Sequence, residues 1–337
     1  MKAYAISKPF ETALLEIEEP VPGPTDVVLD VKYLGLCGSD LNSYRGLMPF
    51  VTYPRIPGHE ISGIITDKGK AVPASLEIGV KATVSPYTHC GVCPACRQGR
   101  VNACEFNQTL GVQSDGALTE KIAVSYEKIH SCNNLSLKEL ALVEPLSVGY
   151  HGVNRGRVTE TDKVLVIGCG TIGIGAICGA FRKGATVIAA DVDDAKLGMA
   201  KKFGAAYAVN SKTTDLKVFI AEFTQNEGVD VVVEAVGATA TFEVALELVA
   251  FAGRVVTIGY SKQPAQIETQ INVRKELDIL GSRNALRVFP SVISMFERKE
   301  RPFTDIITQI YAFDKTPDAF ADWDKNPGKV SKILIEL

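Results

Sequence analysis

The chain has 337 residues, of which 46% are hydrophobic, and this length and composition suit two domains with buried cores. Its net charge of -3 excludes a basic surface of the kind that binds nucleic acid. The N-terminal stretch lacks the apolar run of a secretory signal, and no window reaches the roughly 18 apolar residues of a membrane span, so we expect a cytoplasmic protein without a nucleic-acid or membrane partner.

Short apolar strands between Pro- and Gly-rich turns, such as 26–33 and 63–66, occupy the first part of the chain and predict an irregular all-β domain. Within it, Cys37 follows a predicted strand, and His59 with Glu60 leads into another. Thiolate, imidazole and carboxylate groups are the zinc ligands of proteins, and turns beside rigid strands commonly carry function. Each residue taken alone could equally be a packed core residue, so only their combination indicates a metal site.

Four cysteines then fall within one short loop, Cys90, Cys93, Cys96 and Cys104, with the spacing C-x2-C-x2-C-x7-C. This run could form disulfides, an iron-sulfur site or a zinc site. A reducing compartment disfavours disulfides. The bacterial ferredoxin run ends in x3-C-P and comes with a partner run, which this sequence lacks. We therefore predict a structural zinc held by four thiolates, which leaves no ligand position for a substrate and requires that catalysis occur elsewhere.

A glycine-rich loop follows an apolar strand and precedes a predicted helix. Gly168 allows a tight turn, Gly170 lets a pyrophosphate approach the backbone N–H groups, and Gly173 lets the helix pack against the strand. Thr171 and Ile172 begin the helix, whose N-terminus faces the phosphates with the positive end of its dipole. A Gly-rich packing turn is the alternative, but the strand and helix on either side favour a dinucleotide site.

The second predicted strand of this unit ends in Asp191, about 20 residues after the glycine loop. A carboxylate there can accept hydrogen bonds from the adenosine ribose 2'-OH but repels a 2'-phosphate. The acidic residues Asp193 and Asp194 follow, where an enzyme that uses NADP would offer Arg or Lys. The sequence therefore predicts NAD as the cofactor.

Strands and helices continue to alternate beyond Asp191, which predicts a doubly wound parallel sheet over about 145–285. Gly259 ends one of these strands and is a further candidate for cofactor binding. The predicted elements are a strand at 229–237, a helix at 240–250, and strands at 253–259 and 276–281.

Five motifs, in this order and spacing, resemble the zinc-dependent medium-chain dehydrogenase family, and the resemblance covers nearly the whole chain. The motifs are Cys37-Gly-Ser-Asp, Gly58-His-Glu, the four-cysteine loop, Glu144-Pro145 and the glycine loop. The family implies an α/β protein with a GroES-like β-barrel catalytic domain and a Rossmann cofactor domain. The implied domains are 1–144 for the catalytic domain with a zinc lobe at 86–108, 145–285 for the cofactor domain, and 286–337 for a return to the catalytic domain.

The resemblance also implies a second, catalytic zinc with Cys37 and His59 as ligands. The remaining protein ligand is either Glu60 or Glu144. One of the two carboxylates ligates zinc while the other hydrogen-bonds the bound water, or the two exchange as substrate arrives. Either glutamate could instead only orient a neighbouring ligand.

Ser39 matches the hydroxyl that relays the proton of the substrate alcohol in this family. Many relatives have a histidine as the outer proton acceptor where this sequence has Asn42, an amide that cannot titrate. The group that accepts the proton after Ser39 is therefore not assigned by the sequence, and water could replace the histidine. The family also implies a homodimer or homotetramer with a small-molecule substrate.

A carboxylate in place of a second cysteine ligand resembles the sorbitol dehydrogenase branch. Within it, stretches including Gly281-Ser-Arg283-Asn284-Ala are similar to bacterial sugar-acid 5-dehydrogenases of the L-galactonate and L-gulonate type. Arg283, with Asn284 beside it, could clamp a substrate carboxylate, form a surface ion pair or contact the cofactor. We expect oxidation of a secondary alcohol of a sugar acid. The alternatives are a neutral polyol dehydrogenase and a non-catalytic sensor that binds nicotinamide.

Overall fold

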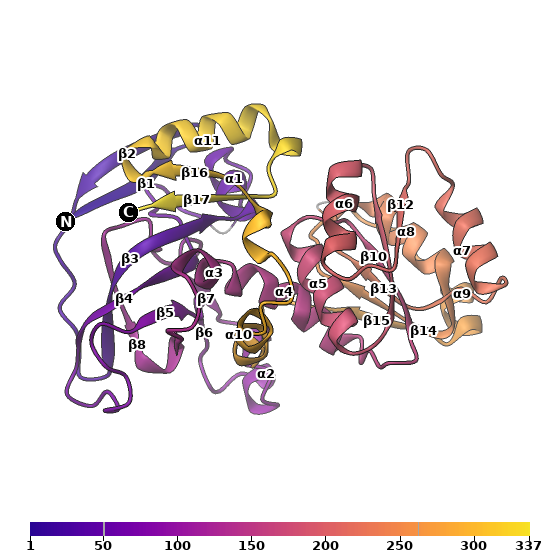
Figure 1. The fold of residues 1–337 in the computed structure, drawn as a ribbon, viewed down its shortest axis with the longest axis horizontal. Coiled ribbons are helices and arrows are strands. Elements are labelled where there is room, and N and C mark those ends of the chain that lie inside the picture. Colours follow the sequence, from indigo (N-terminus) through magenta and orange to yellow (C-terminus); the bar gives the residue numbers. More distant parts are fainter. Residues whose placement is uncertain (50, 262) are drawn as a thin grey trace. The chain divides into compact units, whose positions relative to one another are not determined.

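The computed structural model describes residues 1–49, 51–261 and 263–337. The chain forms two compact units, one made of Met1–Glu144 with Phe289–Leu337 and the other of Pro145–Val288. In Figure 1 the C-terminal elements of the first unit, in yellow, lie beside its N-terminal strands, in indigo. The first unit is therefore discontinuous in sequence, and its second boundary falls three residues after the expected position of 285/286.

A large sheet forms the frame of the first unit. Within the described residues it has seven strands in the order β16-β17-β3-β4-β5-β9, with β8 paired to β3 outside this path. Neighbours are antiparallel except β16 and β17, which are parallel. The strands are β3 (Asp26–Leu36), β4 (Glu60–Lys68), β5 (Lys81–Val84), β8 (Lys121–Ser125), β9 (Ile129–Ser131), β16 (Ile307–Ala312) and β17 (Lys332–Glu336).

Two small sheets and several short helices complete this unit. One small sheet pairs β1 with β2 and the other pairs β6 with β7. Their strands are β1 (Lys2–Lys8), β2 (Glu11–Glu16), β6 (Tyr87–Thr88) and β7 (Gln108–Thr109). The α-helices are α1 (Gly38–Tyr44), α2 (Pro94–Arg97), α3 (Leu137–Ala141), α10 (Phe289–Glu297) and α11 (Thr316–Lys325), while α4 (Val143–Arg155) contains the boundary. The 3-10 helices are η1 (Val101–Ala103), η2 (Tyr126–Lys128), η3 (Phe303–Ile306), η4 (Phe313–Lys315) and η5 (Pro327–Lys329).

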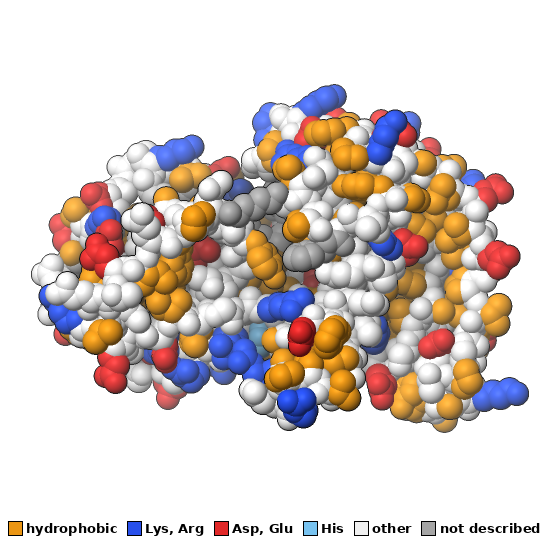
Figure 2. Space-filling view, turned by 180° about the vertical axis from the view of Figure 1, so that it is seen from behind, with side chains coloured by type: hydrophobic (Ala, Val, Ile, Leu, Met, Phe, Trp, Pro, Cys, Tyr) orange, Lys and Arg blue, Asp and Glu red, His pale blue; other side chains and the backbone are white. Residues whose placement is uncertain are grey.

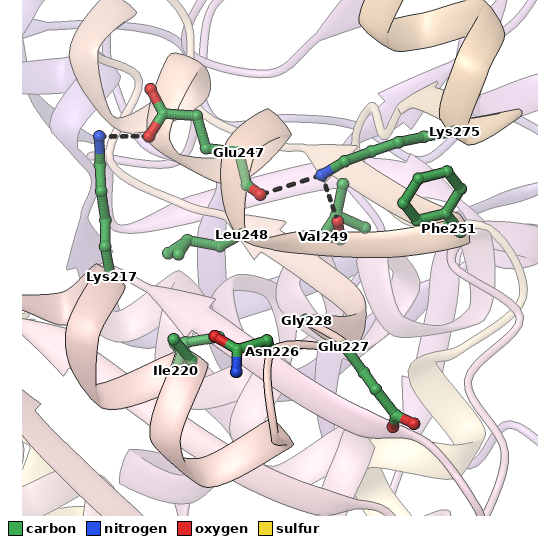
Figure 3. A pocket seen from close by; sticks show the side chains of 11 residues that line it. Lys217, Ile220, Asn226, Glu227, Gly228, Glu247, Leu248, Val249, Phe251 and Lys275 are labelled. Carbon is green, nitrogen blue, oxygen red and sulfur yellow. Dashed lines mark hydrogen bonds and ion pairs between the residues drawn. The ribbon is translucent and has the colours of Figure 1, made fainter.

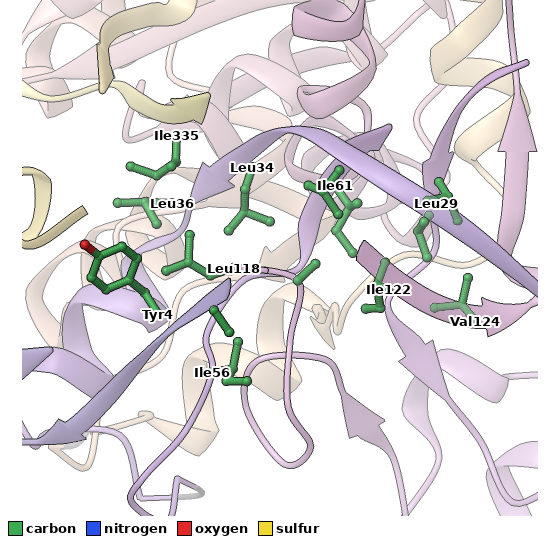
Figure 4. Close-up of a cluster of buried hydrophobic side chains, with 14 of the residues drawn as sticks. Tyr4, Leu29, Leu34, Leu36, Ile56, Ile61, Leu118, Ile122, Val124 and Ile335 are labelled. Atoms are coloured by element: carbon green, nitrogen blue, oxygen red, sulfur yellow. The ribbon is translucent and has the colours of Figure 1, made fainter. Parts of the chain in front are cut away.

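The apolar core of the first unit lies against the long strands β3 and β4 (Figure 4). Leu29, Leu34 and Ile61 are fully buried in it, and each such side chain contributes about 1.5–3 kcal/mol relative to an exposed one. Gly58, at φ +104°, lies so close to Leu34 that a Cβ would approach the Leu34 Cδ2 to 2.4 Å. Only glycine fits there, and this tight turn leads the chain into the residue at position 59.

The second unit is built on a parallel sheet with six strands in its described part, in the order β12-β11-β10-β13-β14-β15. The direction of winding reverses between β10 and β13, and such a switch point is where doubly wound sheets bind ligands. Its strands are β10 (Lys163–Ile167), β11 (Thr186–Asp191), β12 (Tyr207–Asn210), β13 (Val229–Glu234), β14 (Val249–Thr257) and β15 (Asp278–Gly281). Its helices are α5 (Thr171–Arg182), α6 (Asp194–Lys202), α7 (Leu216–Thr224), α8 (Thr239–Leu248) and α9 (Thr269–Lys275).

The surface carries charges of both signs. Figure 2 shows basic and acidic side chains spread over the visible face together with scattered hydrophobic ones. Among the helices of the described residues, none combines the length and the apolar composition that a membrane crossing requires.

Candidate active site

Three potential metal ligands meet where β3 ends and β4 begins. Cys37 directly follows β3 and is the N-cap of α1, while His59 and Glu60 stand at the start of β4. Gly35 pairs with Glu60 in the antiparallel register of these strands, so the two strand ends are neighbours. One ligand atom from each of the three side chains lies within 4.8 Å of the other two. A thiolate, an imidazole and a carboxylate at this separation fit a zinc ion.

Buried anions surround His59. Asp40 is fully buried, with its Oδ1 3.9 Å from His59 Nδ1, and its Oδ2 accepts a hydrogen bond of 2.8 Å from the backbone N–H of Cys37. Burial lowers the pKa of His59, but the negative charges of Asp40 and Cys37 outweigh it and raise this pKa well above its usual value. The same negative charges favour a metal cation at this position. The Ser39 Oγ is also buried, without a hydrogen-bond partner among the described residues.

A buried lysine holds the carboxylate of Glu60. Lys332 Nζ lies 2.5 Å from Glu60 Oε1 and also donates a hydrogen bond of 3.0 Å to the carbonyl oxygen of Leu36. The second oxygen, Glu60 Oε2, is buried without a partner in the described part of the chain. It lies over Gly35, where a Cβ would come within 2.0 Å of it. Sequence reasoning missed Lys332, whose only signal is a single charge at the start of the apolar strand β17.

Glu144 occupies a different position from Glu60. It lies in the first turn of α4, is 4% exposed, and accepts a hydrogen bond from the hydroxyl of Tyr87. Among the described residues, the group within metal-binding distance of Cys37 includes Glu60 and does not include Glu144. Burial raises the pKa of Glu144 from its usual 4.5 to about 7, although His59 and Tyr87 act to lower it. Tyr87 was also missed from the sequence, because a tyrosine close to a cysteine loop carries no specific signal.

The four-cysteine loop forms a second potential metal site. One Sγ atom from each of Cys90, Cys93, Cys96 and Cys104 lies within 4.8 Å of all the others, and no disulfide joins these described residues. The helix α2 and the 3-10 helix η1 bring the cysteines together. Backbone N–H groups, with that of Cys96 first, lower the pKa of the Cys93 thiol to about 6 and so favour the thiolate that a metal binds. Four thiolates suit a tetrahedral zinc.

The glycine loop joins β10 to α5 at the switch point of the second unit. Gly168 has φ +93°, which favours glycine, and Gly170 is the N-cap of α5. A Cβ on Gly173 would lie 1.8 Å from the carbonyl oxygen of Gly168, whereas a Cβ on Gly170 would meet no described heavy atom within 4 Å. Thr171 is buried and Ile172 is half-buried at the start of the helix. The loop thus packs tightly at its ends and is open in the middle, as a phosphate-binding loop requires.

Asp191 ends β11 beside this loop. Its carboxylate accepts hydrogen bonds from the backbone N–H groups of Cys169 and Val192, both at 2.7 Å, and of Asp193 at 3.1 Å. Because Cys169 belongs to the glycine loop, these bonds fix the carboxylate next to the predicted phosphate site. A carboxylate held there suits the hydroxyl pair of an NAD ribose.

The remaining candidate residues follow the last two strands of the parallel sheet. Gly259 lies two residues after β14, and a Cβ there would come within 2.2 Å of the backbone N of Gly237. Arg283 and Asn284 follow β15, and both are half-buried. Carboxyl ends of strands in a doubly wound sheet face the ligand crevice, so all three residues stand at the edge where sheets of this kind bind ligands.

A surface pocket of the second unit, of about 280 Å³, lies away from this edge (Figure 3). Its lining includes Gly228 and Val249, which stand at the amino ends of β13 and β14. Its two lysines already have partners in the protein. Lys275 donates to the carbonyl oxygens of Glu247, at 3.0 Å, and Val249, at 2.8 Å, and Lys217 forms an ion pair with the Glu247 carboxylate. Both lysines of the pocket are therefore already engaged within the protein.

Comparisons with known proteins bear on the fold and the family of this chain. A family model for zinc-binding dehydrogenases matches residues 171–298, and one for the alcohol dehydrogenase GroES-like domain matches residues 23–134. The chain is 32% identical to an L-galactonate-5-dehydrogenase of Escherichia coli K12 over 85% of this chain and 84% of that protein. It is 31% identical to a sorbitol dehydrogenase of Halalkalibacterium halodurans over 96% and 95%. The crystal structure of an alcohol dehydrogenase from E. coli CFT073 in complex with NADH matches with a TM-score of 0.93 at 30% identity, covering 100% of this chain and 99% of that one. These matches confirm the predicted fold class.

Proposed function

Because the chain belongs to the family of zinc-dependent medium-chain alcohol dehydrogenases, with zinc and NAD as cofactors, we propose that it oxidises a secondary alcohol of a sugar acid to the keto-acid. The observation that carries the catalytic part is the buried group of Cys37, His59 and Glu60, whose ligand atoms lie within 4.8 Å of one another. An alcohol dehydrogenase needs such an open metal site, whereas the four-cysteine site is filled by its own ligands.

In this proposal Cys37, His59 and Glu60 hold the catalytic zinc, which supplies a Lewis acid for the oxygen of the alcohol. The buried carboxylate of Asp40 lies 3.9 Å from His59 Nδ1, too far for a hydrogen bond, and its negative charge favours a cation at this site. The Ser39 hydroxyl would accept the proton of the substrate hydroxyl and release its own, and bound NAD would accept the hydride from the carbon of the alcohol. The products are the ketone, NADH and one proton.

The exit of this proton depends on the groups that lie beyond Ser39. The exposed side chain at position 42 is an amide, so it cannot accept the proton from Ser39. We infer that the proton passes to water. The buried Glu144 and the half-buried Tyr87 form an acid and phenol pair near the proposed metal ligands, and the Tyr87 hydroxyl keeps the Glu144 carboxylate oriented. In this proposal Glu144 forms hydrogen bonds at the site, and Glu60 is the carboxylate that binds zinc.

The substrate class rests on the relatives and on Arg283. An L-galactonate-5-dehydrogenase and a sorbitol dehydrogenase are both about 30% identical to this chain, and the first of them acts on a sugar acid. Arg283 follows β15 at the edge of the sheet where doubly wound units bind ligands. A guanidinium there can hold a carboxylate through two parallel hydrogen bonds, which a neutral polyol cannot use.

The test is NADH formation from L-gulonate, L-galactonate, sorbitol and L-threonine by the zinc-loaded protein, with a chelator control. We expect the two sugar acids to give the highest kcat/KM. Arg283→Ala should raise KM for the acids by about tenfold or more and leave sorbitol almost unchanged, since a charged bidentate contact contributes roughly 1.5–3 kcal/mol. The nearby exposed Arg287→Ala is the matched control and should alter neither.

Two results would contradict parts of this proposal. If sorbitol outperforms both acids, the substrate is a neutral polyol and the carboxylate clamp is wrong. If the protein binds NADH and two zinc ions but turns over no alcohol of a broad panel, it is a nicotinamide sensor on an enzyme scaffold.

A further inference from the structure

Lys332 connects the two segments that carry the proposed ligands of the catalytic metal. Its Nζ reaches the carbonyl oxygen of Leu36, the residue before Cys37, at 3.0 Å and the Oε1 of Glu60 at 2.5 Å. The lysine comes from β17, far along the chain from both segments. One ammonium group thus joins the end of β3 to the start of β4, at the point where the metal ligands converge.

The ammonium of Lys332 is buried and lies among several acidic groups. At 4% exposed, Lys332 is the only lysine or arginine that is buried in the part of the chain that the structure describes. The nearby groups that can carry a negative charge are the Cys37 thiol and the carboxyl groups of Asp40, Glu60 and Glu144. A bound metal ion and Lys332 would therefore be the two strong positive charges in a buried anionic cluster, with the Glu60 carboxylate between them.

We propose that Lys332 is a positioning residue that competes with the catalytic metal for the carboxylate of Glu60. The inference rests on the proposed function in one respect, that Cys37, His59 and Glu60 hold zinc. One oxygen of Glu60 is already paired with the ammonium, and the other, over Gly35, has no partner among the described residues. Two cations that share one carboxylate repel each other across a short distance in a site of low dielectric. Each cation therefore weakens the binding of the other, and this coupling is reciprocal.

The competition has a consequence for the metal site. Cys37 and His59 have no such competing cation and hold the metal continuously, whereas Glu60 binds it against the attraction of Lys332. Glu60 becomes the ligand that is most easily released when another oxygen needs the position. The Leu36 contact keeps the ammonium in place, so that the carboxylate returns to a fixed partner instead of moving freely in the buried site.

The experiment measures zinc release from the full-length, zinc-loaded protein to a chromophoric chelator. The phase that belongs to the catalytic site is the one that disappears in Cys37→Ser, and the remaining phase belongs to the four-cysteine loop. Lys332→Met keeps the length of the side chain and removes the charge, and we expect it to slow the catalytic-site phase by about tenfold or more. Lys332→Arg keeps the charge and should stay within about twofold of the wild type.

Two controls distinguish the proposed competition for Glu60 from a general effect of removing a lysine. Lys121 forms a surface ion pair with Glu19 at the same distance of 2.5 Å, and Lys121→Met should leave both release phases unchanged. In a Glu60→Gln background the contested carboxylate is gone, so adding Lys332→Met should slow release much less than in the wild type. If Lys332→Met alone does not fold, Lys332→Gln, which also removes the charge, takes its place in both backgrounds with the same expected results.

Unchanged or faster release from folded Lys332→Met, with the four-cysteine phase intact, would overturn the competition. An equally large effect of Lys332→Met in the Glu60→Gln background would overturn it too, because the charge would then act on the metal without Glu60. A wild type without any Cys37-dependent zinc phase would instead refute the metal site of the proposed function, and this inference with it.

Discussion

Glu144 should control the stability of the protein when the catalytic site holds no metal. Cys37→Ser removes a proposed ligand of that site and leaves the four-cysteine loop untouched, so it provides the background. In it we compare Glu144 with Glu144→Gln, an amide of the same shape that still accepts a hydrogen bond from Tyr87. The side chain is 4% exposed, and burial raises its pKa from the usual 4.5 to about 7.

The sign of the pH effect on stability depends on whether the folded or the unfolded chain binds the Glu144 proton more tightly. The folded chain, with the raised pKa, retains the Glu144 proton over a pH range in which the unfolded chain has lost it. Between pH 4.5 and about 7 the free energy of unfolding of the protein with Glu144 therefore falls as the pH rises. At about 1.4 kcal/mol per pKa unit, the loss reaches about 3 kcal/mol above pH 7. The amide at position 144 does not titrate and escapes this loss.

The assay is urea unfolding of both variants at pH 5 and at pH 8. We expect Glu144→Gln to stabilise the Cys37→Ser protein by less than about 1 kcal/mol at pH 5 and by about 3 kcal/mol at pH 8. Zinc added to protein with an intact Cys37 should reduce the advantage of the amide, because the metal's charge favours the ionised carboxylate. An advantage that is the same at both pH values would refute the reasoning.

Three other results are expected from the two units. Metal analysis should find close to two zinc ions per chain, with one retained in folded Cys37→Ser, whereas Cys93→Ser should lower the thermal stability of the lobe; a single metal in the wild type would contradict the two sites. Asp191→Ser should lose most of the preference for NAD over NADP in kcat/KM, and equal use of both cofactors by the wild type would show that this carboxylate does not contact the ribose. Gly173→Ala places a methyl group 1.8 Å from the Gly168 carbonyl oxygen, so it should weaken NADH binding in fluorescence titrations at least tenfold, and unaltered affinity would show that the loop adapts.

Local features of the sequence were enough to predict much of the second unit. The glycine loop, the strand before it and the helix after it are neighbours in the chain, and their signals depend on turn chemistry and on short apolar runs. The prediction was less accurate where a strand is irregular. A strand was expected from 253, but β14 begins at Val249, because the pairing with β13 shifts between Val229 and Val231 and Ala252 takes a positive φ of 55°.

The contacts of the proposed catalytic residues could not be predicted from the sequence. Cys37 and His59 could be proposed because each stands in a recognisable motif at a strand end. Lys332 meets Glu60 across 272 positions, because β17 and β4 both pair with β3. Tyr87 of β6 meets Glu144 of α4 across 57 positions, and no local pattern specifies either contact. A lysine in an apolar strand has no periodic signal for the buried anion that it will contact, and neither does a tyrosine before a cysteine loop.

The discontinuous first unit also sets an order of events during biosynthesis. The ribosome makes the continuous unit 145–288 before it makes β17, so the parallel sheet can fold while the frame of the first unit still lacks a strand. Until Lys332 emerges, the carboxylate of Glu60 has no ammonium partner, and a metal ion that arrives early meets no competitor for it. On the competition proposed above, zinc bound by the nascent chain would be held more tightly by Glu60 than zinc in the finished protein, because the last strand supplies the competing ammonium.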